Sequence, residues 1–141
     1  MDRRTIPWCD FATGATAGDG GKVHNRSYLL GSDGAILATY NKIHLFDVQL
    51  REGEMYRESA TVEPGTRCTL GPLPWGQLGM TVCYDVRFPH LYRMLAQQGA
   101  DFLAVPAAFT ATTGEAHWHV LLRARAIETG CYVFAPGQCG R

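Results

Sequence analysis

The second half of this 141-residue chain alternates strand and helix signals. Residues 77–83 are an apolar run typical of a strand, and apolar side chains then recur at helical spacing over 88–96, with a proline in the first turn and a glycine just past the end. Residues 101–106 predict a buried strand, residues 114–129 a second helix and residues 131–135 a further strand. Alternation of this kind predicts a layered α/β fold.

The first half carries weaker signals. Two apolar runs, 27–31 and 35–40, flank Ser32-Asp33-Gly34 and predict a hairpin. Residues 9–22 are rich in glycine and predict a loop or a disordered lead-in, and the polar stretch 47–63 predicts a long loop.

Composition narrows the function classes. Thirteen basic residues balance thirteen acidic ones without clustering, which argues against a nucleic-acid or membrane-surface partner. The sequence has no apolar run of the ~20 residues that a membrane span needs, and no secretory signal, so we expect a cytoplasmic protein. We also expect no cofactor, and no metal because no set of ligands has suitable spacing. The cysteines are odd in number, share no C-x-x-C spacing, and favour reduced thiols: Cys9, Cys68, Cys83, Cys131 and Cys139.

Cys83 is the strongest candidate for chemistry, because it lies where a predicted strand gives way to a helix. A helix N-terminus favours a thiolate, and nearby backbone N–H groups, with that of Tyr84 as the natural candidate, can receive an oxyanion. A thiol is an effective nucleophile only as thiolate, so its site must lower the thiol pKa or supply a base. For any single cysteine a structural role is the commoner one, and we assign that role to the other four.

Three motifs in fixed order, spanning 40–47, 82–88 and 117–128, resemble those of the nitrilase (carbon–nitrogen hydrolase) superfamily, in its omega-amidase-like branch. The resemblance implies an α/β fold, a fragment of the α-β-β-α sandwich of that family. It divides the chain into a flexible or non-native lead-in, residues 1–24, and a partial hydrolase domain, residues 25–141, without the opening strand–helix unit and the C-terminal strands. Sheet edges and apolar faces left open in such a piece favour a homo-oligomer.

The same resemblance implies hydrolysis of an amide C–N bond in a small substrate through a thioester on Cys83. Lys42 would stabilise the oxyanion, and Glu58 matches a second glutamate beside the site, with Glu52 and Glu54 as weaker candidates. The family also uses a general-base glutamate before the lysine. The acids that precede Lys42 here are Asp2, Asp10, Asp19 and Asp33, and none fits, so the chain alone is expected to be inactive.

Arg87 is a candidate for binding a substrate carboxylate, since a guanidinium can hold one through two parallel hydrogen bonds. A structural role, in which Arg87 forms an ion pair with Asp85 or a loop glutamate, explains this arginine nearly as well. His117 and His119 point to different faces of a helix and cannot chelate one metal together.

Two other functions stay open. A papain-like hydrolase would pair Cys83 with His44, His90 or His117, although no matching sequence context is present. A non-catalytic fragment would keep the fold signals without activity. Within the family resemblance, amidase, nitrilase and carbamoylase activities all stay open.

Overall fold

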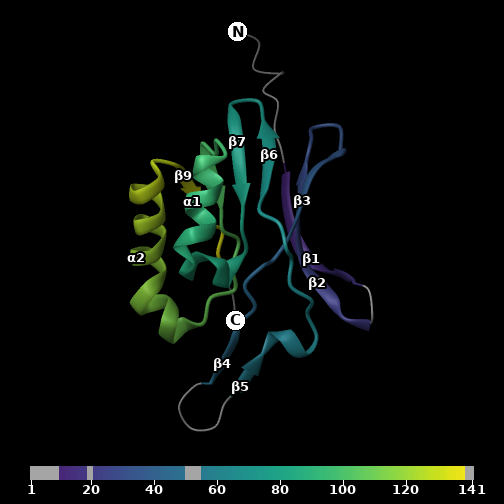
Figure 1. Ribbon diagram of the computed structural model, residues 1–141, viewed down its shortest axis with the longest axis vertical. Helices are drawn as coiled ribbons and strands as arrows, with labels where there is room; N and C mark the ends of the chain where they lie inside the picture. The colour runs from purple at the N-terminus through teal and green to yellow at the C-terminus, as the bar shows by residue number, and fades with distance from the viewer. Residues whose placement is uncertain (1–9, 19–20, 50–54, 139–141) are drawn as a thin grey trace.

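The computed structural model describes residues 10–18, 21–49 and 55–138. Figure 1 shows three layers: two helices, a four-stranded sheet beside them, and a three-stranded sheet on the far side. The expected α/β class is confirmed, and these are three of the four layers of the expected sandwich.

The three-stranded sheet is an antiparallel meander of β1 (Asp10–Ala17), β2 (Val23–Leu30) and β3 (Ile36–Asn41). The predicted hairpin between β2 and β3 is confirmed. Its turn is closed by the Asp33 carboxylate, which accepts the Ala35 N–H at 3.0 Å, and by Gly34 at φ 80°, a left-handed value that glycine adopts without strain. The predicted loop over 9–22 is wrong for β1, because the backbone of β1 pairs with β2 along its whole length, which compensates for its poor strand composition.

The four-stranded sheet runs β6-β7-β8-β9. The hairpin of β6 (Thr69–Leu73) and β7 (Gly76–Met80) is antiparallel, whereas β8 (Phe102–Ala104) and β9 (Tyr132–Phe134) join in parallel. The crossovers between the parallel strands are α1 (Pro89–Gln97) and α2 (Ala111–Thr129), as the alternation predicted. Strand β6 was not predicted.

The polar stretch 47–63 is not wholly a loop. It contains a short hairpin, β4 (Asp47–Gln49) with β5 (Met55–Arg57), followed by the 3-10 turn η4 (Glu58–Ala60). The Asp47 carboxylate accepts the Ser59 N–H at 3.0 Å, which fixes the turn to the hairpin.

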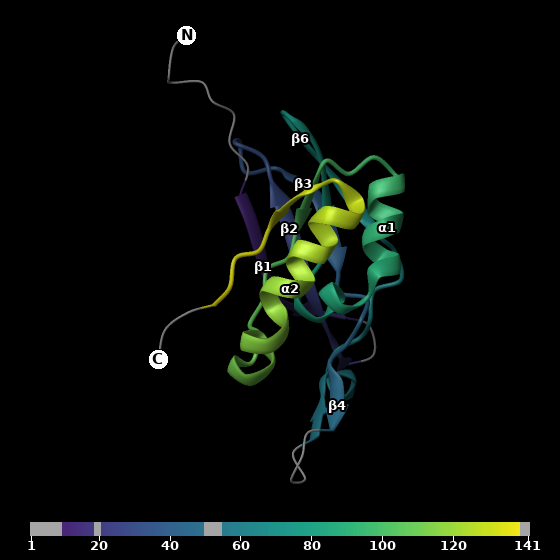
Figure 2. The same ribbon diagram turned by 90° about the vertical axis from the view of Figure 1, so that its left-hand side faces the viewer.

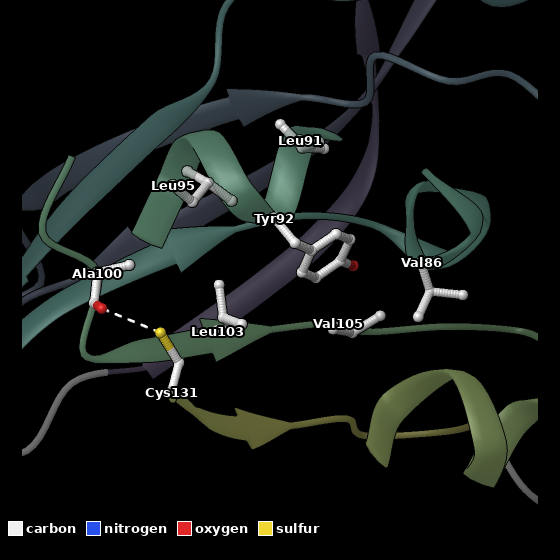
Figure 3. Packing of buried hydrophobic residues seen from close by; sticks show 8 residues of the cluster. All are labelled: Val86, Leu91, Tyr92, Leu95, Ala100, Leu103, Val105 and Cys131. Atoms are coloured by element: carbon white, nitrogen blue, oxygen red, sulfur yellow. Dashed lines mark hydrogen bonds between the residues drawn. The ribbon is translucent and has the colours of Figure 1, made fainter. Parts of the chain in front are cut away.

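Two apolar clusters join the layers. Between the two sheets, Leu29 and Tyr40 pack with Leu78, Met80 and Val82. Between the four-stranded sheet and the helices lies the second cluster, whose members Figure 3 labels: Val86, Leu91, Tyr92, Leu95, Ala100, Leu103, Val105 and Cys131.

Helix α2 lies across the front of the molecule in Figure 2, with α1 beside it. Its buried Arg125 donates from Nε to the Val86 carbonyl at 3.0 Å, which ties the helix to the η5 segment, and pairs with Glu128 of the same helix at 2.7 Å. Neither described helix is long and apolar enough to span a membrane.

Candidate active site

Cys83 lies on a sharp bend of the backbone. Strand β7 ends at Met80, and the 3-10 turn η5 (Cys83–Arg87) leads into α1. Cys83 has φ 50°, and no other non-glycine residue of the described chain has positive φ, a conformation that costs energy and is concentrated at functional sites. Its N–H donates to the Pro106 carbonyl at 2.9 Å, which holds the bend against the end of β8.

The Asp85 carboxylate, which is fully buried, braces this bend. It accepts hydrogen bonds from the Val82 N–H at 2.9 Å and the Tyr40 hydroxyl at 2.8 Å, and from the His44 N–H at 3.1 Å and ring Nδ1 at 2.7 Å. The ion pair between Asp85 and Arg87, one of the structural alternatives for Arg87, is absent from the described residues. The carboxylate points inward to the β3 segment, whereas Arg87 lines the cavity described below.

Lys42 is buried, with 3% of its side chain exposed, and its ammonium pairs with Oε2 of Glu58 at 2.6 Å. The same Glu58 oxygen accepts the Phe46 N–H at 2.6 Å, and Oε1 accepts from the Asn25 amide at 3.3 Å. Glu58 thus orients the lysine from the η4 turn. Glu52 and Glu54, the weaker alternatives, lie outside the described residues.

The backbone at Lys42 is clamped between two chain segments. Its N–H donates to the Asn25 carbonyl and its carbonyl accepts from the Gly65 N–H, both at 2.8 Å. A Cβ at Gly65 would lie 2.1 Å from the Asn41 carbonyl oxygen, so glycine is required for this close approach.

A cavity of about 840 Å³ brings the candidate residues together. Cys83, Lys42, Glu58, Tyr84 and Arg87 all line it, although they come from distant parts of the sequence. Strands β1 and β2 form part of the wall, and aromatic side chains form another part: Phe46, Tyr56, Tyr84 and Phe109. Glu58 is the one carboxylate among the described residues that line it.

Burial raises the pKa of the Cys83 thiol, and this outweighs the opposing effect of the Lys42 ammonium. The Ala108 and Tyr84 backbone N–H groups also favour the thiolate, and the Glu58 carboxylate disfavours it. A raised thiol pKa argues against the first of the two routes open from sequence, a lowered thiol pKa, and leaves the second, a supplied base. Ala108 was missed because nothing in the sequence places the chain after β8 beside Cys83.

Arg87 reaches into the cavity between aromatic rings. Its guanidinium lies 5.3 Å from the centroid of the Phe109 ring and 5.9 Å from that of Tyr84, and Nη1 is 3.3 Å from Nδ1 of His117. Within the described part of the chain no carboxylate forms a salt bridge with Arg87, although the guanidinium lines the cavity.

The three histidines considered for a Cys–His pair have other surroundings. His44 is held by Asp85 and stacks on Phe88 with ring centroids 3.7 Å apart, His117 contacts Arg87, and His90 is exposed. None of the three histidines is among the groups with the largest effect on the pKa of the Cys83 thiol. Over residues 10–18, 21–49 and 55–138 no cluster of three metal-ligating side chains is found.

The sequence model of the carbon–nitrogen hydrolase family matches residues 3–141. Among curated proteins, a deaminated glutathione amidase from Synechocystis is 55% identical over 128 residues, which cover 88% of this chain and 46% of the relative. The chain thus spans about half the length of that protein.

Solved structures of related proteins are also similar to this chain. The C. elegans NitFhit protein superposes with a TM-score of 0.81 at 44% identity, over 87% of this chain and 30% of that one. A mutant amidase from Nesterenkonia sp., with the acetamide moiety of fluoroacetamide added covalently to its active-site cysteine, gives a TM-score of 0.79 at 27% identity, over 94% of this chain and 48% of the other.

Proposed function

Because this chain belongs to the carbon–nitrogen hydrolase family, we propose that its cavity cleaves the amide C–N bond of a small, carboxylate-bearing substrate through a thioester on Cys83. The observation that carries the proposal is the cavity itself, which gathers a strained cysteine, a buried lysine–glutamate pair and an arginine without a carboxylate partner in the described chain. The amidase relatives support amide hydrolysis as the reaction class.

In the proposed first step, the Cys83 sulfur forms a bond to the amide carbon, and the carbonyl electron pair moves to oxygen. The Lys42 ammonium and the Tyr84 N–H, with the Ala108 N–H beside the thiol, are the donors that stabilise this oxyanion. Collapse of the intermediate breaks the C–N bond and leaves the thioester, and the departing amine or ammonia takes up the proton that was removed from the Cys83 thiol. Water then hydrolyses the thioester and releases the acid.

Proton removal from the thiol is the demanding part of this sequence. Burial keeps the thiol pKa raised, so a base is needed at neutral pH. Glu58 is the carboxylate available among the described lining residues, and it is already engaged by Lys42 and the Phe46 N–H. We therefore propose that the 141-residue chain by itself hydrolyses amides slowly, since loss of a general base typically costs ~10² to 10⁴ in rate.

The substrate class follows from the charge in the cavity and from the relatives. Arg87 offers a bidentate site for a carboxylate, and a cavity of about 840 Å³ holds more than a simple aliphatic amide. The relative named deaminated glutathione amidase favours an acidic, peptide-like amide.

An activated acyl donor tests the proposal without needing fast turnover. The chain is mixed with the mono-4-nitrophenyl ester of glutaric acid, quenched in acid and digested, and the acylated peptide is identified by mass spectrometry. We expect the glutaryl group on Cys83, and no such adduct in Cys83→Ala. Acyl groups spread evenly over the five cysteines, or an unchanged nitrophenolate burst in Cys83→Ala, would refute the proposal.

A further inference from the structure

The Asp85 carboxylate is an unusual group for this position, because it is fully buried and has neither a lysine nor an arginine partner in the described chain. Burying a charge is costly unless hydrogen bonds compensate for the lost water. Here four donors do so, and they belong to only three residues: Val82, Tyr40 and His44.

These donors flank the two residues to which the proposed function assigns the chemistry. Val82 directly precedes Cys83, and its N–H reaches Oδ2 of Asp85 at 2.9 Å. Tyr40 and His44 lie two residues before and two residues after Lys42. One carboxylate therefore ties both sides of the lysine to the bend that carries the cysteine.

The connection is reinforced on the lysine side. The Tyr40 hydroxyl donates to Asp85 and also accepts the Ile43 N–H at 3.2 Å, so it closes a ring around the Lys42 backbone. Tyr40 is fully buried, and the His44 ring is stacked on Phe88. Side chains with so little freedom hold the segment in one position.

Glu58 orients the Lys42 ammonium, but it comes from the η4 turn and makes no bond to the bend at Cys83. The Asp85 network, by contrast, joins the backbone on both sides of Lys42 to the bend at Cys83. We propose that Asp85 is a positioning residue that, through Tyr40 and His44, holds Lys42 at the Cys83 thiol; this inference rests on the roles of Lys42 and Cys83 in the proposed function.

The test is the pH dependence of Cys83 alkylation by iodoacetamide in the full 141-residue chain, resolved by peptide mass spectrometry. Alkylation follows the thiolate fraction, so its midpoint reports how well Lys42 supports the thiolate. Tyr40→Phe is the main variant. Burial raises the Tyr40 pKa far above its ordinary value, so the hydroxyl is uncharged and the substitution alters no charge.

Tyr92→Phe is the matched control. Tyr92 is equally buried and its hydroxyl is 2.7 Å from Oγ1 of Thr81, close to the same bend, but it has no bond to the Lys42 segment. Lys42→Met supplies the reference for complete loss of the cation, with an expected upward shift of about one pH unit or more.

We expect Tyr40→Phe to raise the midpoint of the alkylation curve by about half a pH unit, which makes alkylation roughly threefold slower at a pH below the midpoint. Tyr92→Phe should leave the midpoint unchanged. Asp85→Asn should shift it upward too, although loss of a negative charge alone would shift it downward. If Asp85→Asn does not fold, the midpoint of Tyr40→Phe compared with that of Tyr92→Phe decides whether the inference holds.

The outcomes separate the two proposals. No shift in Lys42→Met would refute the role of Lys42 in the proposed function. A shift in Lys42→Met with Tyr40→Phe indistinguishable from Tyr92→Phe, both with lowered melting temperatures, would make the Asp85 network a structural element only. A downward shift in a folded Asp85→Asn would likewise overturn the inference.

Discussion

The Lys42 ammonium lies 2.6 Å from the Glu58 carboxylate in the wall of the cavity that holds Cys83, with the lysine almost fully buried and the glutamate 17% exposed. Because the two side chains differ in exposure, losing one partner should not cost the same stability as losing the other. Loss of the glutamate leaves a buried cation without a partner, whereas loss of the lysine leaves a carboxylate that water can still reach.

Glu58→Gln should therefore destabilise the chain strongly, by about 3 kcal/mol in the free energy of unfolding, because it leaves the Lys42 charge uncompensated. Lys42→Met should cost less, since Glu58 keeps the Phe46 N–H. Urea unfolding of both variants and of the double variant measures this. A double variant less stable than Glu58→Gln alone would contradict it.

Arg87→Lys keeps the positive charge and removes the bidentate fork. We expect acylation of Cys83 by the acidic glutaric ester to slow by about tenfold, in line with the loss of a charge-assisted hydrogen bond. Acylation by 4-nitrophenyl butyrate, which has no carboxylate, should change little. Equal losses with both donors, together with a lower melting temperature, would assign Arg87 to the scaffold.

Arg125→Ala should destabilise the chain by about 2–4 kcal/mol, because the arginine is buried and its Nε satisfies the Val86 carbonyl next to the site. Arg123→Ala is the control on the same helix, since Arg123 is exposed, and it should change the free energy of unfolding by less than about 0.5 kcal/mol. Chemical denaturation compares the two. Similar values for both would show that the buried contact contributes little.

Alkaline pH should unfold the protein through two buried tyrosines. Burial raises the pKa of the Tyr40 and Tyr92 hydroxyls, so the unfolded chain releases both protons near pH 10 while the folded chain retains them. Their contribution to stability is complete below about pH 10 and falls above it, by about 2.7 kcal/mol per pH unit for the pair.

Urea unfolding between about pH 10 and 11.5 measures this slope. Tyr92→Phe removes one of the two hydroxyls and should halve the tyrosine contribution to this slope. A stability that stays level across this range would mean that the hydroxyls ionise freely in the folded chain.

The sequence by itself determined the elements whose signals are local. Helical spacing with Pro89 and Gly99 marked α1, Ser32-Asp33-Gly34 marked a hairpin, and the junction after β7 marked Cys83. Each depends on residues within a few positions of one another, so the backbone preferences act before any tertiary contact forms.

Tertiary structure decided the features that depend on residues far apart in the sequence. Strand β1 has three alanines and one glycine among its eight residues and forms through its pairing with β2. Asp85 bonds Tyr40 and His44 and not the nearby Arg87. The thiol pKa of Cys83 was undecidable from sequence for the same reason. Burial and the Lys42 charge act on it in opposite directions, and only the packed structure determines which is larger.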